Sequence, residues 1–282
     1  MSGSVSYTPL FQAQNEPRYQ RQSLIREYEE EYDCNLVVML GQVTSESVTL
    51  LNECLESVDD QKPLHLMLRS PGGDPEAAIR LIRMCHGASS EFRVLVPEQA
   101  KSAATIMSLG ADKIVMGPTS DLGPIDPQVF VPERGFVSAK DLIAAYDSVL
   151  EMVAVSPGTS TFHAALLGGI DTTTVQFARS AMERTGDIAR QAIESNEHLS
   201  VEDVEKLCKS IQGPLIDQPK VHGAVVGARE AEAAGLPIEL LCMQDHQWKQ
   251  IQKLWTRYFA LGELHRLYAY EGVRASQVGY YS

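Results

Sequence analysis

The stretch LHLMLRSPGGDPEAAIRLIRMCHG, residues 64–87, places a short apolar run, two adjacent glycines and an amphipathic segment in direct succession. Leu64–Arg69 has the length and apolar character of a buried strand. We predict a helix over Asp74–Gly87, because Asp74 is a favoured N-cap residue and Pro75 suits the first helical position. The stretch therefore indicates a strand, a glycine turn and a helix, which is the repeating unit of α/β proteins.

The same alternation continues on both sides of this unit. Further strands are predicted at Leu36–Gly41, Phe92–Val96 and Lys113–Met116, and further helices at Thr44–Val58 and Ser102–Leu109. Strands that alternate with helices favour a mostly parallel sheet covered by helices on both faces. The predicted fold class is therefore α/β.

The remaining segments are predicted to be largely helical. Residues 1–16 are expected to be a mobile arm, and residues 17–33 a solvated helix that leads into the fold. Helical patterns follow at Ser138–Val153, Asp171–Glu194, Ser200–Ser210 and Gln247–Tyr270, with a helix–strand step at Gly227–Leu241. We divide the chain into an N-terminal arm and leading helix (1–33), a main domain (34–243) and a C-terminal helix and tail (244–282), so that a helical C-terminal arm ends the fold.

Composition excludes several classes of protein. The chain has 282 residues, of which 44% are hydrophobic and 22% charged, so wholesale disorder is excluded. A formal net charge of −13 argues against nucleic acid or an anionic membrane as the main partner. Apolar runs such as Ile238–Met243 are far shorter than the roughly 20 residues of a spanning helix. No signal-peptide core is visible in Met1–Ser23, and we expect a cytoplasmic protein.

Cysteine and histidine spacing predicts neither a disulfide framework nor a metal site. The five cysteines are far apart and form no CxxC pair, so they read as reduced thiols. No HExxH motif is present, and the seven histidines are scattered. We expect no metal and no cofactor.

Two stretches could together carry chemistry. In Gln99–Thr105, Ser102 stands at a strand-to-helix corner, with the Ala103 N–H at the positive end of the helix dipole. Beside Gly72 and Gly73, whose N–H groups can point at a negative atom, this corner could form an oxyanion hole. The alternatives are a turn that needs only glycine flexibility, and a serine that serves only as a helix cap.

The third stretch, Met116–Gln128, is rich in Gly and Pro and by itself indicates only a structured loop. The three stretches in this order resemble the ClpP/crotonase-fold serine peptidases, and most closely the serine dehydrogenase proteinases related to signal peptide peptidase A. In that group SPGG (here 70–73), AxSAATxxxLGADxIVMG (100–117) and LGPIDPQ (122–128) recur together. The resemblance runs from about Asn35 to Leu241. It implies a ClpP/crotonase-like fold with ββα-type units, and a peptidase domain at 34–243.

The resemblance implies a nucleophile and oxyanion donors. It places Ser102 at the nucleophile position, with the oxyanion hole at Gly72, Gly73 and Ala103. Signal-peptide-peptidase relatives take the general base from a lysine on a helix beyond the LGPIDPQ loop, which here corresponds to Lys140. The pair Ser138 and Asp141 resembles a capping box that puts Lys140 in the first helical turn. The alternative is an exposed first-turn lysine.

Other residues compete for the role of base. A ClpP-like triad would place a histidine in the loop after the fourth strand, where Gly123–Pro127 offers none. His222 precedes the stretch that resembles the family's final helix, and could act as base or as an orienting residue. Lys101 is adjacent to Ser102, but neighbouring residues at a helix start point apart. Asp126 could orient a base, or simply form a turn beside Pro127.

The function implied by the resemblance is a serine endopeptidase of the Ser–Lys type, preferred over Ser–His–Asp. Its expected partners are a peptide or unfolded-protein substrate and further copies of the chain in a homo-oligomer. The alternatives are a catalytically inactive ClpP-like scaffold or peptide-binding oligomer, and a crotonase-type acyl-CoA enzyme.

Overall fold

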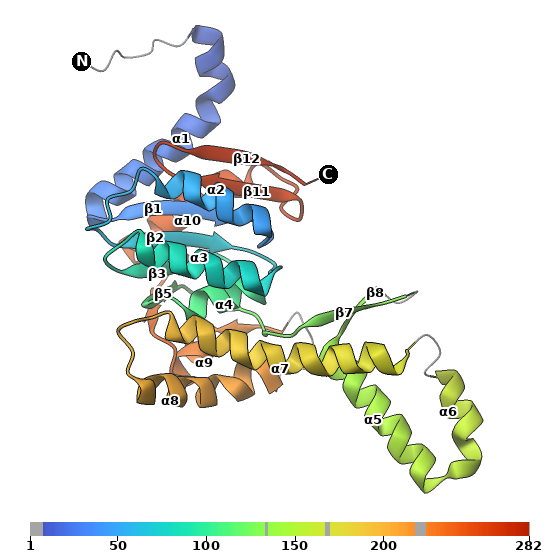
Figure 1. Cartoon of the computed structure of the whole chain (residues 1–282). Coiled ribbons are helices and arrows are strands. Elements are labelled where there is room, and N and C mark those ends of the chain that lie inside the picture. Colours follow the sequence, from blue (N-terminus) through green and yellow to red (C-terminus); the bar gives the residue numbers. More distant parts are fainter. Residues whose placement is uncertain (1–7, 133–134, 167–169, 218–223, 282) are drawn as a thin grey trace.

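A seven-stranded sheet forms the centre of the protein, as seen in a computed structural model that describes residues 8–132, 135–166, 170–217 and 224–281 (Figure 1). The strand order is β10-β5-β3-β2-β1-β11-β12. The first five of these strands run parallel, and β11 and β12 are antiparallel additions at one edge. The strands are β1 Asn35–Leu40, β2 Leu64–Arg69, β3 Phe92–Val96, β5 Lys113–Met116, β10 Ile238–Leu240, β11 Leu267–Glu271 and β12 Ser276–Tyr280. The predicted α/β class with a mostly parallel sheet is confirmed.

Two smaller sheets accompany the main one. The first has the order β4-β6-β9 and is made of Gln99–Ala100, Asp121–Leu122 and Val226–Gly227. The second is a hairpin of β7 (Gln128–Val131) and β8 (Gly135–Ser138). The sequence patterns predicted none of these short strands.

Helices connect the strands and extend away from them. They are α1 Pro9–Tyr32, α2 Ser45–Leu55, α3 Pro75–Gly87, α4 Ala103–Leu109, α5 Ala139–Val155, α6 Ser160–Leu166, α7 Thr172–Glu194, α8 Val201–Ile211, α9 Ala228–Ala233 and α10 His246–Phe259. A 3-10 turn, η1 (Pro157–Thr159), precedes α6, and a π-helical turn, η2 (Gln212–Asp217), follows α8. As predicted, α3 begins after an Asp74 cap, which accepts from Glu76 N at 2.9 Å.

The sheet separates two apolar cores. In β1, Val37 and Met39 belong to the core under α2, α3 and α4, whereas Leu36 and Val38 belong to the core under α1 and α10. This division follows from the alternation of side chains along a strand, and both faces are apolar because both are covered.

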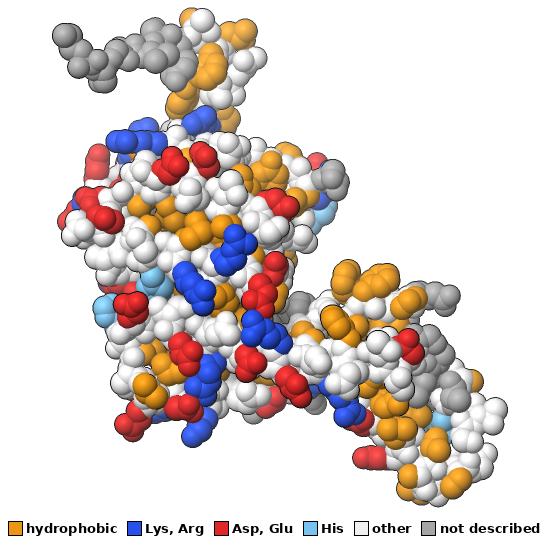
Figure 2. Space-filling view, in the orientation of Figure 1, with side chains coloured by type: hydrophobic (Ala, Val, Ile, Leu, Met, Phe, Trp, Pro, Cys, Tyr) orange, Lys and Arg blue, Asp and Glu red, His pale blue; other side chains and the backbone are white. Residues whose placement is uncertain are grey.

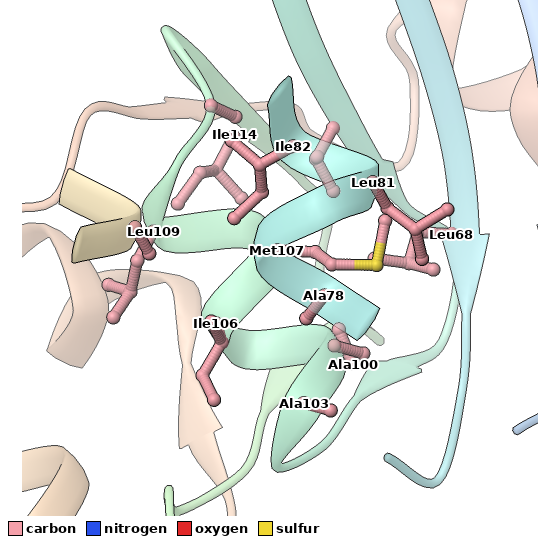
Figure 3. Packing of buried hydrophobic residues seen from close by; sticks show 14 of the residues in the cluster. Leu68, Ala78, Leu81, Ile82, Ala100, Ala103, Ile106, Met107, Leu109 and Ile114 are labelled. Carbon is pink, nitrogen blue, oxygen red and sulfur yellow. The ribbon is translucent and has the colours of Figure 1, made fainter. Parts of the chain in front are cut away.

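Helix α4 lies deep in the first core. All seven of its residues are buried, and Figure 3 shows its Met107 beside Leu81 of α3 and Leu68 of β2. Small residues such as Ala103 and Ala104 allow α4 to sit against α3 and the ends of the strands. The start of α4 is therefore fixed by packing on several sides.

A long projection leaves the body beyond β6 (Figure 1). We call residues 128–132, 135–166 and 170–180 the arm; they include β7, β8, α5, α6 and the first part of α7. The arm has a small core of its own, made of Val129, Val131, Ala139, Leu142, Val175 and Ala178. Large apolar side chains are exposed on it, among them Phe130, Val155 and Phe162, and Figure 2 shows apolar side chains gathered there.

The two ends of the fold differ from the prediction. Helix α1 begins at Pro9, so the part of the predicted mobile arm that the structure describes is helical; residues 1–7 lie outside the described residues. Helix α10 ends at Phe259, and the predicted continuation to Tyr270 is wrong. Gly262 has a φ of 75°, which ends the helical path, and β11 then pairs with the open edge of β1.

A buried ion pair joins these two ends. Arg21 Nε of α1 donates to Glu271 Oε2 of β11 at 2.6 Å, and Glu271 is fully buried. Tyr258 of α10 and Ser276 of β12 each donate to the same carboxylate, both at 2.6 Å. The carboxylate therefore links four elements.

None of the helices within the described ranges combines the length and the apolarity needed to span a membrane.

Candidate active site

The glycine turn, residues 70–74, follows the carboxyl end of β2. Ser70 is fully buried, and its Oγ accepts from Gly72 N at 3.0 Å. Gly72 and Gly73 have φ values of 108° and 143°, which side-chain-bearing residues rarely adopt. The Gly72 N–H is thus used inside the turn and not, as the resemblance predicts for it together with Gly73 and Ala103, in the oxyanion hole.

Gly73 lies against the main chain of Val43. Val43 N donates to Gly72 O at 2.9 Å and Val43 O accepts from Asp74 N at 2.8 Å. Val43 and Gly73 thus form a parallel bridge in which Gly72 and Asp74 make the hydrogen bonds. In such a bridge the N–H and C=O of the middle residue, here Gly73, point away from the partner strand. A Cβ on Gly73 would lie 2.1 Å from Val43 O, so this position requires glycine. No described residue accepts from the Gly73 N–H.

The elbow, residues 99–103, presents Ser102 between β4 and α4. Ser102 has φ 50° and ψ −114°, a strained conformation for a residue with a side chain. Although Ser102 is the N-cap residue of α4, its hydroxyl makes no capping hydrogen bond, so the helix-cap alternative is wrong. Among the described residues, neither the Ser102 hydroxyl nor the Ala103 N–H has a hydrogen-bond partner within the protein.

Main-chain hydrogen bonds join the glycine turn to the elbow. Ser70 N donates to Gln99 O at 3.1 Å, and Lys101 N donates to Ser70 O at 3.0 Å. A Cβ on Gly72 would lie 2.7 Å from the Cβ of Ser102 and 3.3 Å from its Oγ. The absence of a side chain at Gly72 therefore lets the turn approach the serine.

A cavity of about 550 Å³ opens beside Ser102. Gly73, Ser102 and Ile106 line it from the body. Phe136 of β8 and both Phe177 and Ile188 of α7 line it as well. The serine hydroxyl thus meets a largely apolar space that is open to solvent, of a size that suits a few peptide side chains.

Lys140 occupies the predicted place in the first turn of α5. Ser138 is the N-cap residue of this helix, and its Oγ accepts from Asp141 N at 3.3 Å. The Lys140 ammonium donates to the main-chain oxygen of Asp217 in η2. Among the described residues, Lys140 does not line the cavity. Ser138 Oγ, however, donates at 3.0 Å to Asp126, which does line it.

The other candidates for the base are placed differently. The Lys101 ammonium forms an ion pair with Asp121. Asp126 lies in the cavity wall. His222 lies outside the described residues, so its role stays a prediction.

Sequence reasoning missed the residues that come from distant elements. Val43 supplies the main chain against which Gly73 rests, and Phe177 and Ile188 of α7 line the cavity. The cavity-lining residues of α7 are Phe177, Ala181, Arg184, Thr185 and Ile188, which share one face of a helix. This periodicity can be read from the sequence, but the partner of that face cannot.

Comparison with known proteins gives a family and two partial relatives. Residues 8–156 match the profile of a family described as ClpP-like SDH-type serine proteinase. An uncharacterized protein of Methanocaldococcus jannaschii is 34% identical over 87 residues, which are 31% of this chain and 30% of that protein. A second uncharacterized protein of the same organism is 25% identical over 104 residues, 37% of this chain and 34% of that protein. The matches thus span about a third of each relative's length.

A solved structure of the 1510-N membrane-bound stomatin-specific protease, in a serine-to-alanine mutant form, is also similar. The two chains have 14% sequence identity and a TM-score of 0.38, over 78% of this chain and 81% of that chain.

Proposed function

Because the chain belongs to the family of ClpP-like SDH-type serine proteinases, we propose that it hydrolyses peptide bonds through an acyl-enzyme on Ser102. The observation that carries this proposal is the strained elbow. A serine with φ 50°, a hydroxyl that is not used as a cap, and a cavity in front of it are what a nucleophile at a strand-to-helix corner requires.

Gly73 and Ala103 are the proposed oxyanion donors. Their N–H groups have no acceptor among the described residues, and Ala103 is the first residue of α4, where the helix dipole is positive. Two such donors stabilise the tetrahedral oxyanion, and loss of one typically costs about 10²–10³-fold in kcat. Gly72 is proposed to allow close approach, because its own N–H is bonded to Ser70.

The substrate is proposed to bind as an extended peptide. Gly73 presents its N–H and C=O on the side opposite Val43, so a peptide can pair there as an added strand. Ser102 Oγ then attacks the carbonyl carbon while the general base accepts the hydroxyl proton. The base returns this proton to the leaving amine, and water hydrolyses the acyl-enzyme.

Lys140 is the proposed base, with His222 as the alternative base or orienting residue. Ser138, two residues before Lys140, donates to Asp126 in the cavity wall, so the first turn of α5 lies near the cavity. For catalysis the Lys140 amine must leave the Asp217 carbonyl to which it donates. Lys140→Arg keeps the positive charge but cannot accept a proton. We expect this variant to lose hydrolysis, whereas His222→Asn should retain it if lysine is the base.

The direct test is labelling with a fluorophosphonate probe together with hydrolysis of an unfolded protein. Ser102→Ala should abolish both without changing the melting temperature. Ser108→Ala is the matched control, because Ser108 lies in the same helix with its hydroxyl bonded to Ala104 O at 2.9 Å. A wild-type protein that takes up no probe would support the inactive scaffold instead.

The protein is further proposed to be a homo-oligomer that uses the arm as its contact. Exposed apolar side chains such as Phe130, Val155 and Phe162 support this proposal, because apolar groups on a projection gain most from being covered. A contact at the arm would also lie next to the cavity, since Phe136 and Phe177 line it.

A further inference from the structure

The Lys101 side chain leads away from the neighbouring Ser102 and into the interior. Lys101 is only 8% exposed. Its ammonium forms an ion pair with Asp121 of β6 and donates to the main-chain oxygen of Ala224 at 3.1 Å. Ala224 lies two residues before β9. Lys101 therefore fastens the elbow to β6 and to the segment that leads into β9.

The space for this side chain exists because residue 123 is a glycine. A Cβ on Gly123 would lie 2.2 Å from Cδ of Lys101 and 3.1 Å from its Cα. Thr105 of α4 holds the glycine in place, because its Oγ1 donates to Gly123 O at 2.9 Å. The segment 121–123 thus provides a carboxylate for the ammonium and room for the aliphatic part of the same side chain.

The main chain of Lys101 connects the elbow with the glycine turn. Lys101 N donates to Ser70 O at 3.0 Å, and Lys101 O accepts from Ala104 N at 2.9 Å. A Cβ on Gly72 would lie 2.9 Å from Lys101 O. A rotation of the peptide between Lys101 and Ser102 would therefore disturb the turn and the start of α4 together.

A strained residue persists only where its surroundings hold it, since such a conformation is unfavourable by itself. We propose that the Lys101–Asp121 ion pair is a clamp that keeps Ser102 in its strained conformation, with the hydroxyl facing the cavity. This inference rests on the proposed nucleophilic role of Ser102. Lys101 and Asp121 are positioning residues, which act through the main chain and do not touch the substrate.

The Lys101→Arg variant separates the role of a clamp from the role of a general base. A base must give up its proton, which a guanidinium does not do in proteins. Lys101→Arg keeps the charge that pairs with Asp121. The clamp therefore predicts a rate of fluorophosphonate labelling within about threefold of wild type. Misplacement of a reacting group would instead lower this rate by about 10²-fold. Complete loss of labelling in Lys101→Arg, with the fold retained, would instead assign Lys101 as the base.

The test removes each side of the pair in the full-length protein. Lys101→Met and Asp121→Asn should each lower kcat and the labelling rate by about 10²-fold, because misplacement of a reacting group by about 1 Å has this effect. KM should change little, since neither residue lines the cavity. The double variant should have the same kcat and labelling rate as either single variant, because both substitutions remove the same ion pair. Arg179→Met is the control, because it removes an exposed ion pair with Asp147 in the arm.

Hydrogen exchange provides a readout that does not depend on hydrolysis. Exchange at the amides of Ala104 and Ile106, which donate to Lys101 O and Ser102 O, should become faster in Lys101→Met, while the amides of β2 keep their wild-type rates. If Ser102 is not the nucleophile, labelling fails in all variants but this exchange difference still reports the clamp. Wild-type exchange rates at Ala104 and Ile106 in Lys101→Met would overturn the proposal. If the wild-type protein is labelled, unchanged labelling in Lys101→Met and Asp121→Asn would overturn it as well.

Discussion

The elbow with its glycine turn and the arm use similar residues in different ways. Gly73 in the turn and Gly135 in the arm hairpin both have positive φ values, 143° and 78°. A Cβ on Gly73 would collide with Val43, whereas a Cβ on Gly135 would meet no atom within 4 Å. The glycine turn therefore needs glycine because other segments lie close to it, whereas Gly135 is needed only for its backbone conformation.

The same contrast holds for charge and apolar surface. The body buries the Arg21–Glu271 pair, with side-chain exposures of 6% and 0%. The Arg179–Asp147 pair of the arm is 47% and 46% exposed. The body therefore buries its charge pair, whereas the arm leaves its charge pair in solvent. The arm also leaves large apolar side chains exposed, among them Phe130 and Phe162.

Substitution of the two glycines should give the largest difference between the regions. Gly73→Ala adds backbone strain of about 1–3 kcal/mol and steric overlap of about 1–3 kcal/mol. It should therefore lower the free energy of unfolding by up to about 6 kcal/mol and abolish hydrolysis. Gly135→Ala should cost only about 1–2 kcal/mol, which is the penalty of a side chain in the left-handed conformation. Chemical denaturation measures both, and equal effects would remove the contrast.

Removal of one carboxylate from each region should give the next largest difference. Glu271→Gln leaves the Arg21 charge buried without a counter-ion and should cost about 3–5 kcal/mol. Asp147→Asn disrupts an exposed pair and should cost less than about 1 kcal/mol. Thermal unfolding of both variants at neutral pH tests this, and a cost below 1 kcal/mol for Glu271→Gln would contradict it.

Acid should destabilise the body through His65, which lies on β2. Desolvation, with a smaller contribution from Arg93, lowers the pKa of His65 to about 3. Below pH 6.5 the unfolded chain binds a proton at this residue that the folded protein does not. Stability is thus fully present above pH 6.5 and is lost as the pH falls, by at most about 1.4 kcal/mol per pH unit.

His65→Asn should flatten this dependence between pH 7 and pH 5. Asn can still accept the hydrogen bond that the Tyr28 hydroxyl shares with His65 Nδ1 at 2.9 Å. Denaturant midpoints of wild type and variant across this range provide the measurement. Parallel curves for the two proteins would show that His65 does not carry the effect.

The smallest effect on stability is expected in the arm. Phe130→Ser and Phe162→Ser, at 61% and 64% exposed, should each change the free energy of unfolding by less than about 0.5 kcal/mol. Combined, they should shift the protein toward smaller assemblies in light scattering. Val201→Ser on α8, where Val201 is 82% exposed, should leave the mass unchanged. An unchanged mass in the phenylalanine variant would exclude the arm as the contact.

Local patterns were sufficient to predict much of the fold. Strands β2, β3 and β5 and helix α3 have apolar runs, caps and turns that lie within a few residues of one another. β11 was missed because its stability comes from pairing with β1, more than 200 residues away in sequence. The two-residue strands β4, β6 and β9 were missed because a strand of this length leaves no periodicity to detect.

Some features of the candidate site could be predicted from local sequence, and others could not. Gly72, Gly73 and Ser102 could be selected because glycine pairs and strand-to-helix corners are local signals. The occupation of the Gly72 N–H by Ser70 depends on the turn conformation. The cavity wall formed by Phe177 depends on the packing of α7, and no pattern in the sequence states where that helix lies.

The Arg21–Glu271 contact has a consequence for synthesis on the ribosome. The two residues are 250 positions apart, so at roughly 5–20 residues per second the guanidinium waits about 12–50 s for its carboxylate. During this time β1 also lacks the neighbour that covers its outer edge. Translation therefore passes through a nascent chain in which β1 keeps an unpaired edge and the Arg21 guanidinium stays in water until the last strands are made.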